Sequence, residues 1–285
     1  MTQSSTRSRS VSRIVRGQPV SDGAGVKLNR IIGQRDFDML DPFLMLDEFR
    51  SDQANDYLAG FPNHPHRGFE TVTYMLAGRM RHHDNQGNSG LLSPGSVQWM
   101  TAGRGIVHSE MPEQEDGLMW GFQLWVNLPA SDKMTEPRYQ DIAPDKIPLI
   151  EPATGVSVRV IAGAMRDVIG PVTGVATEPV YLDISLQVGA AFDAPLPLGH
   201  SAFAYVYDGA VSIGGIANEQ AVERGELAVL AGGDYARLVA RDTAARLIIV
   251  AGKPLGEAVV KYGPFVMNTP EQIAEAIRDF QSGSF

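Results

Sequence analysis

The chain of 285 residues contains no cysteine. This absence excludes disulfide bonds, thiolate catalysis and sulfur-ligated metals, so any bound metal needs His, Asp or Glu ligands. No apolar run approaches the roughly 18 residues that a membrane-spanning helix requires, and the N-terminus lacks the apolar core of a secretory signal. We therefore expect a protein that does not insert into membranes, with the cytoplasm as its location.

Basic residues are also few, and they are scattered along the chain. The formal net charge is −9, which opposes direct nucleic acid binding because such binding needs a basic face to neutralise phosphates. There is no glycine-rich phosphate-binding loop. Apolar residues make up 44% of the chain, so a chain of this length can bury one large core or two ordinary ones.

The sequence does contain a series of short strand-like segments. Residues 70–76, 97–100 and 121–128 are rich in β-branched and aromatic side chains, and turns with glycine or proline separate them. Helical periodicity is almost absent from this part of the chain. The pattern favours an antiparallel β-barrel or jelly roll.

The same pattern returns in the second half, at residues 156–162, 202–207 and 246–250 for example. We therefore predict an all-β protein with two antiparallel barrel domains in tandem. The expected boundaries are a mobile Ser- and Arg-rich tail at residues 1–16, the first domain at 17–135, a proline-rich linker at 136–152 and the second domain at 153–285.

One clear helix is expected at the end of the chain. Thr269 is suited to the N-cap, Pro270 to the first helical position and Gln272 to the capping-box position. Apolar residues follow at helical spacing, so we predict a helix at residues 270–281. The sequence does not indicate where this helix packs.

Candidate metal ligands concentrate in residues 64–110. If both ends of this stretch are extended, His64 and His66 lie on one sheet face, and His108 and Glu110 also share a face. Such a set suits a divalent first-row metal, because neutral imidazole is a borderline ligand and a carboxylate adds charge. The alternative of three unrelated core histidines would require several buried polar groups with separate partners.

Spacing alone does not decide which carboxylate completes the set. Glu70 lies four residues after His66 and competes with Glu110, or it orients an imidazole without binding the metal. Phe61 and Arg67 flank the first histidine pair, and we expect them beside the metal or in a pocket over it.

Two further histidine positions have simpler interpretations. Residues 82–84 read His-His-Asp, and adjacent residues on a strand face opposite ways, so a solvated turn is favoured. His200 stands alone near a turn of the second half, and we interpret it as a structural or surface residue.

The second half does not repeat the candidate ligands. Superposing the halves on their turn glycines places Pro195 and Pro197 at the positions of the first histidine pair, and Ser201 at that of Glu70. Arg237 and Val239 fall at the positions of the His-x-Glu pair. We therefore expect one metal site and one copy without ligands.

Four segments together resemble the pirins of the cupin superfamily. They are residues 64–72, 98–112, 124–128 and 262–269, and the resemblance covers all but the first dozen or so residues. It implies two cupin domains, of which the N-terminal one binds iron and the C-terminal one is empty.

The resemblance also implies a ligand set of His64, His66, His108 and Glu110. The general cupin pattern would instead use Glu70, so the choice of Glu110 rests on the closer match to pirins. The implied metal is Fe(II), with Ni, Mn, Cu, Co or Zn as alternatives.

Two classes of function follow from the resemblance. Some bacterial pirins look like quercetin 2,3-dioxygenases, which implies a flavonol substrate, O2 as co-substrate, ring opening with release of carbon monoxide, and Glu110 as the catalytic base. Animal pirins co-regulate transcription factors, so the alternative is a non-enzymatic metal-binding regulator with a partner protein. A cupin enzyme for an unrelated small molecule is a third possibility, since fold does not fix function.

Overall fold

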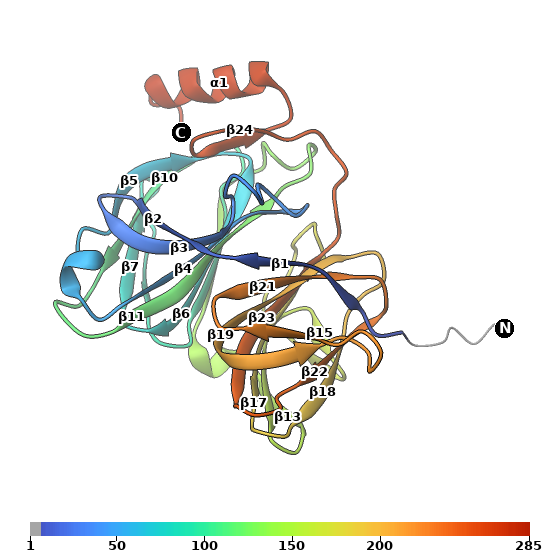
Figure 1. Cartoon of the computed structure of the whole chain (residues 1–285). Helices are drawn as coiled ribbons and strands as arrows, with labels where there is room; N and C mark the ends of the chain where they lie inside the picture. Colours follow the sequence, from blue (N-terminus) through green and yellow to red (C-terminus); the bar gives the residue numbers. More distant parts are fainter. Residues whose placement is uncertain (1–6) are drawn as a thin grey trace. The chain divides into compact units, whose positions relative to one another are not determined.

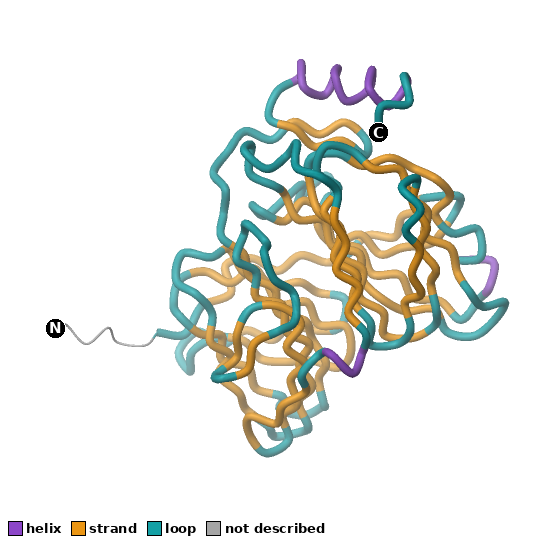
Figure 2. The backbone as a smooth tube through the Cα atoms, turned by 180° about the vertical axis from the view of Figure 1, so that it is seen from behind, coloured by secondary structure: helices purple, strands orange, loops and turns teal. Residues whose placement is uncertain are grey.

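The computed structural model describes residues 7–285, which form two compact units. The N-terminal unit comprises residues 18–144 and 255–285. The C-terminal unit comprises residues 145–254 together with the described residues up to Gly17. Strands dominate both units (Figures 1 and 2).

The N-terminal unit contains most of the strands predicted for the first half. Its strands are β2 (Gln18–Asp22), β3 (Val26–Ile32), β4 (Phe43–Ser51), β5 (Phe61–His66), β6 (Phe69–Ala77), β7 (Met80–Asp84), β8 (Ser89–Leu92), β9 (Val97–Thr101), β10 (Ile106–Pro112), β11 (Met119–Asn127), β12 (Arg138–Ile142), β24 (Val260–Tyr262) and β25 (Phe265–Met267). A short 3-10 turn lies at Ala54–Asp56, and the helix α1 spans Pro270–Gln281. A second 3-10 turn, Pro144–Lys146, lies at the boundary between the two units in the sequence.

Two sheets form the body of this unit. One has seven strands in the order β12-β9-β6-β11-β4-β3-β2, and the other has four in the order β5-β10-β7-β8. Every pairing within them is antiparallel. Both sheets end in unpaired edge strands, so the unit is a two-sheet jelly roll and not a barrel closed all round.

The C-terminal unit also consists mainly of antiparallel strands. Its strands are β1 (Ser10–Arg16), β13 (Leu149–Ala153), β14 (Val156–Ala162), β15 (Ala164–Met165), β16 (Val168–Ile169), β17 (Val180–Leu186), β18 (Ala191–Pro195), β19 (Ser201–Ile213), β20 (Gln220–Glu223), β21 (Glu226–Ala231), β22 (Tyr235–Val239) and β23 (Ala245–Gly252). A ten-stranded sheet follows the order β1-β21-β19-β23-β17-β14-β13, with β18, β20 and β22 branching from it.

Alternation places one apolar face of these strands in a common core. Leu182 and Ile184 on β17, Ala204 on β19, and Leu247 and Ile249 on β23 belong to one buried cluster. This is the period-2 pattern that the sequence shows, and cross-strand packing of such side chains stabilises the sheet.

The predicted mobile tail is wrong for the residues that the structure describes. Residues 10–16 form β1, which pairs with β21. Val11 and Val15 are buried, and Val11 belongs to the core cluster of the C-terminal unit. Ser12, Arg13 and Arg16 are exposed, and the register shifts between Val11 and Arg13, so composition concealed a half-buried strand. Residues 1–6 lie outside the described residues.

The predicted linker is also wrong. Residues 138–142 form β12, which pairs with β9 of the N-terminal unit, and residues 149–153 form β13, which pairs with β14 of the C-terminal unit. Only one proline of this stretch, Pro152, lies in a strand, and β13 is an edge strand of its sheet, where a missing N–H is tolerated.

The helix has the predicted bounds but belongs to the other unit. Thr269 accepts a hydrogen bond from the Gln272 backbone N–H at 3.3 Å, and the Gln272 side chain accepts one from the Thr269 N–H at 3.1 Å. Ile273 and Ala276 pack with Phe265 on β25. Figure 1 shows α1 next to β24, so residues 255–285 complete the N-terminal unit and not the predicted second domain.

No helix among the described residues is long and apolar enough to cross a membrane.

The role of β1 can be tested with a matched pair of variants. Val11→Asp places a charge in the C-terminal core, and we expect it to lower the free energy of unfolding by about 2 kcal/mol or more. Ser12→Asp places the same charge on the exposed face of the same strand, and its effect should stay within about 0.5 kcal/mol. Urea unfolding measures both, and equal stability of the two variants would contradict the pairing of β1.

Candidate metal centre

The pairing of β5 with β10 brings two parts of the chain together at the proposed site. His64 lies directly opposite His108, and His66 lies opposite Ile106. The ring centroids of His64 and His108 are 4.5 Å apart, and those of His66 and His108 are 5.0 Å apart. Both segments are extended, as the sequence predicts.

Among the described residues, these three imidazoles lie close enough together to bind one metal ion. One ring nitrogen from each of His64, His66 and His108 lies within 4.8 Å of the other two. His108 is fully buried, His66 is buried and His64 is partly exposed. These separations allow one ion to reach all three nitrogens after small side-chain adjustments, because zinc- or iron-type ions bind imidazole at about 2 Å.

Burial keeps two of these histidines neutral. Burial lowers the pKa of His66 well below its usual value, and the nearby His108 and His64 lower it further. Burial likewise lowers the pKa of His108, again with a contribution from His64. A neutral imidazole offers the lone pair that a metal needs, so the environment favours ligation over protonation.

The unpaired ring nitrogens fit a metal. Both ring nitrogens of the buried His108 lack a hydrogen-bond partner, an arrangement that is costly unless an ion or a water satisfies them. The His64 Nδ1 lies 2.8 Å from the Pro62 carbonyl oxygen, to which it can donate, and this leaves Nε2 as the acceptor. That Nε2 faces the Nε2 of His66 at 3.0 Å.

Glu110 lies on the same strand as His108 and is also buried. The register of β10 against β5 shifts between these two residues, so Glu110 pairs with Phe61. Its Oε1 lies 3.0 Å from the Thr73 hydroxyl oxygen. Burial raises its pKa, which the nearby His64 and the Thr73 hydroxyl oppose. Glu110 stands outside the 4.8 Å histidine group, and its role as fourth ligand remains a prediction.

Glu70 does not share a face with His66, contrary to the spacing argument. Strand β5 ends at His66 and β6 begins at Phe69, and between them Gly68 has φ +87°. This break transfers the chain to the other sheet. Along β6, Glu70 and Thr73 are an odd number of residues apart, so Glu70 faces away from Glu110 and accepts a 2.6 Å hydrogen bond from Thr101.

Arg67 also points away from the histidines. Its guanidinium forms a 2.8 Å ion pair with Asp279 on α1 and lies over the ring of Phe285, 4.4 Å from the ring centroid. Arg67 therefore fixes the C-terminal segment next to the ligand strand and does not line the pocket.

A buried lysine fixes the same segment to the turn after β5. Lys133 Nζ donates to the carbonyl oxygens of Gly68 at 2.7 Å and Val266 at 3.0 Å, and to Asn127 Oδ1 at 2.7 Å. Burial lowers its pKa to about 8. At Gly68 any side chain would collide, because a Cβ would lie 2.0 Å from the Val266 carbonyl oxygen.

His82 is not in the predicted solvated turn. It lies on β7 with 1% of its surface exposed, opposite Glu110, and its ring stacks on Tyr139. His83, the next residue, is exposed. Buried and exposed residues alternate along β7. The sequence does not show this alternation clearly, because four of the five residues of the strand are polar.

A cavity of about 720 Å³ adjoins the histidines. His64, His66 and Glu110 line one part of it, together with Phe61, as predicted. The lining also includes Trp125, whose ring meets that of His66 edge to face with centroids 5.2 Å apart. A volume in this range accommodates a drug-sized ligand.

The C-terminal unit has apolar side chains where the N-terminal unit has ligands. By order and pairing, β18 and β22 correspond to β5 and β10. Their core-facing residues are Phe192, Ala194, Ala236 and Leu238. Arg237, which sequence superposition placed at the position of His108, points outward and pairs with Asp193 at 3.0 Å. The sequence superposition of the two halves was therefore displaced by one residue in β22. A displacement of one residue along a strand exchanges the core-facing and outward-facing positions.

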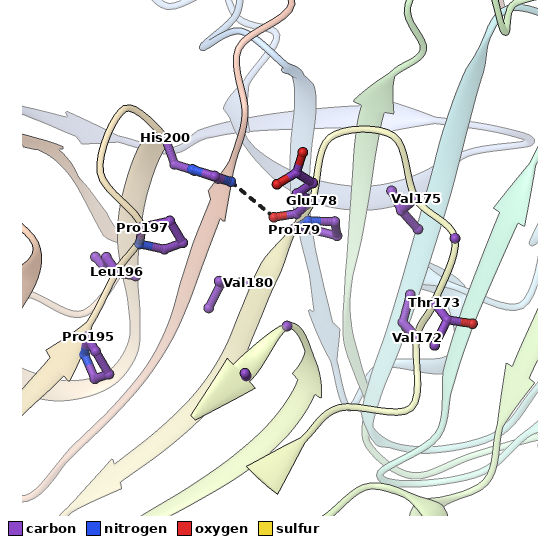
Figure 3. A pocket seen from close by; sticks show the side chains of 13 residues that line it. Val172, Thr173, Val175, Glu178, Pro179, Val180, Pro195, Leu196, Pro197 and His200 are labelled. Atoms are coloured by element: carbon purple, nitrogen blue, oxygen red, sulfur yellow. Dashed lines mark hydrogen bonds between the residues drawn. The ribbon is translucent and has the colours of Figure 1, made fainter. Parts of the chain in front are cut away.

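A second cavity of about 440 Å³ lies in the C-terminal unit (Figure 3). Its lining residues include His200 and three prolines, Pro179, Pro195 and Pro197. His200 Nε2 is 3.1 Å from the Glu178 carbonyl oxygen, and the Glu178 side chain pairs with Lys253 at 3.3 Å. His200 is the one histidine among the lining residues, so this cavity does not resemble the histidine site.

Comparison with known proteins agrees with this geometry. The family model described as Pirin matches residues 25–126, and the model described as Pirin C-terminal cupin domain matches residues 181–285. The chain belongs to the pirin family. Its two units are thus the two cupin-type domains of a pirin, and its metal-site candidates lie in the N-terminal one.

Individual relatives are similar to this pirin over nearly its whole length. A Pseudomonas aeruginosa protein named, provisionally, as a quercetin 2,3-dioxygenase is 52% identical over 98% of both chains. The crystal structure of a quercetin 2,3-dioxygenase from Acinetobacter baumannii has a TM-score of 0.88 and 34% identity, covering 98% of each chain. A bacterial pirin from Escherichia coli, solved with nickel(II), shares the fold at a TM-score of 0.65 and 17% identity, over 85% of this chain and 98% of that one.

The histidine site can be tested by metal loading. We expect His66→Ala and His108→Ala each to abolish stoichiometric metal binding, because each removes one of only three clustered imidazoles. The fold should persist, since the core does not depend on these side chains. His200→Ala, in the other unit, is the matched control and should load normally. Elemental analysis and thermal melts measure the two effects; loss of the cooperative melt in either site variant would instead indicate a structural role.

Proposed function

We propose that this pirin is a metal-dependent dioxygenase that opens the ring of quercetin-type flavonols with O2, and that its metal is Fe(II). The observation that carries the proposal is a cluster of three histidines, two of which line a cavity large enough for a flavonol. The structural similarity to a quercetin 2,3-dioxygenase at 34% identity supports the choice of substrate class.

The residues present fit such a metal. His64, His66 and His108 supply three neutral nitrogen donors, and Glu110 supplies a carboxylate from the same cavity wall. Nitrogen and oxygen donors suit Fe(II), and they equally admit Ni, Mn, Cu, Co or Zn. When bound, the metal supplies Lewis acidity toward the flavonol 3-oxygen and the redox chemistry that O2 requires.

The protein side chains of the cavity have two tasks in this reaction. Glu110 is a metal ligand that also accepts the proton of the flavonol 3-hydroxyl, because it is a buried carboxylate of the cavity lining on the same strand as His108. Asp47, the other buried carboxylate of the lining, is paired with Arg30. Trp125 and Phe61 offer aromatic surface against which a flat phenolic ring can pack. Ring opening then releases carbon monoxide and leaves both atoms of O2 in the ester product.

The alternative function is a metal-binding regulator that acts through a partner protein. Its metal site would be the same, so metal loading does not separate the two proposals. A cavity of this size beside the metal favours a small-molecule ligand. The regulator would be supported by a loaded metal site, no turnover of any flavonol and a defined protein partner.

The dioxygenase proposal predicts substrate-dependent changes at the metal. Anaerobic addition of quercetin to the Fe(II)- or Ni(II)-loaded protein should perturb the metal spectrum, whereas a flavone without the 3-hydroxyl should not. In air the Fe(II) protein should consume quercetin and release carbon monoxide. Glu110→Gln should reduce kcat by about 100-fold or more, because it removes the proton acceptor. Quercetin binding without a spectral change, together with no turnover in air, would rule the proposal out.

A further inference from the structure

A row of polar residues crosses the interior face of the seven-stranded sheet. Asp47 on β4 lies opposite Gln123 on β11, which lies opposite Thr73 on β6, which in turn lies opposite Gln98 on β9. Residues paired directly across neighbouring strands share a face, so these side chains point to the same side. The row is unusual because interior positions of such a sheet are generally apolar.

Thr73 connects this row to the opposite sheet. Its hydroxyl oxygen lies 2.7 Å from Gln123 Oε1 and 3.0 Å from Glu110 Oε1. Thr73 is 1% exposed and Glu110 is 5% exposed, so water cannot readily replace either bond. The Gln98 amide, on the other side of Thr73, donates to Asp141 at 2.9 Å and is committed elsewhere.

The number of protons available for donation determines the hydrogen bonds between the Thr73 hydroxyl, the Gln123 amide and the Glu110 carboxylate. A hydroxyl carries one proton and cannot donate to two oxygens at once. The conflict disappears when the Gln123 amide is turned so that its NH2 group donates to Thr73, since amide oxygen and nitrogen are assigned from such networks. Gln123 then donates to Thr73, and Thr73 donates to the Glu110 carboxylate, which needs a donor because it is buried.

We propose that Thr73, held by Gln123, is a positioning residue that fixes the Glu110 carboxylate for metal binding. One carboxylate oxygen is held by the Thr73 hydroxyl, and the other is left for the metal. The inference rests on the proposed function only in taking Glu110 as a ligand. Hydrogen bonds of this kind orient metal-binding carboxylates and typically change metal affinity 10- to 100-fold.

The test compares three threonine variants of the full-length protein. Thr73→Val keeps the shape but removes the donor, and we expect it to weaken Ni(II) binding by about 10-fold or more. Thr73→Ser keeps the hydroxyl and should restore the affinity. Thr71→Val makes the same chemical change two residues away on the same buried face of β6, and it should bind like the wild type. Calorimetry gives the affinities, and the d–d absorption of the Co(II)-loaded protein reports the ligand geometry.

A double-mutant cycle shows whether Thr73 acts through Glu110. Glu110→Gln should weaken Ni(II) binding, and adding Thr73→Val to it should have little further effect. Wild-type affinity and Co(II) spectrum in Thr73→Val would overturn the inference. So would full additivity with Glu110→Gln, or wild-type affinity of Glu110→Gln itself.

These outcomes are distinguishable from failure of the proposed function. Suppose that the wild type turns over flavonols, that His108→Ala abolishes Ni(II) binding and that Thr73→Val binds Ni(II) normally. The positioning role alone is then wrong. If flavonols are not turned over but Thr73→Val weakens Ni(II) binding through Glu110, the positioning role stands and the dioxygenase proposal falls.

Discussion

The antiparallel pairing of β5 with β10 is the constraint on which the metal site depends. It sets His64 opposite His108 although the two residues are 44 positions apart in the sequence. Backbone hydrogen bonds fix this register, so the imidazoles are brought together by the sheet and not by the metal. A site assembled in this way is prearranged before any ion binds, which reduces the free energy spent on ordering ligands.

The interior of the N-terminal unit is polar to a degree that apolar packing alone does not explain. His66, His108, Glu110 and Thr73 are all buried in one jelly roll, and each buried polar group without a partner is costly. A cation between the imidazoles would take one of the two unpaired nitrogens of His108 and would compensate for the buried carboxylate. In the C-terminal unit the corresponding positions are apolar, so that copy retains the fold without this cost.

Each end of the chain belongs to the unit that is formed mainly by the other half of the sequence. The strand at residues 10–16 completes the sheet of the C-terminal unit, and residues 255–285 complete the N-terminal unit. The C-terminal segment reaches the turn that follows the first histidine pair, where Arg67 pairs with Asp279 and Lys133 bonds to both Gly68 and Val266. The loop that sets the direction of His66 is therefore fixed by residues from the far end of the sequence.

The sequence by itself determined the all-β class, the duplication, the bounds of the helix and the candidate ligands on each of two strands. These depend on local signals: period-2 alternation, capping chemistry and the spacing of histidines on single strands. It could not determine how Glu70, Arg67 and His82 are oriented, because a break at Gly68 and pairing with distant strands decide the faces of these residues. It also could not place the two chain ends in their units, since a short edge strand of alternating valine and polar residues has no local mark of its partner. Only the tertiary structure decided that Thr73 contacts Glu110, because that contact joins two sheets whose facing residues no sequence pattern relates.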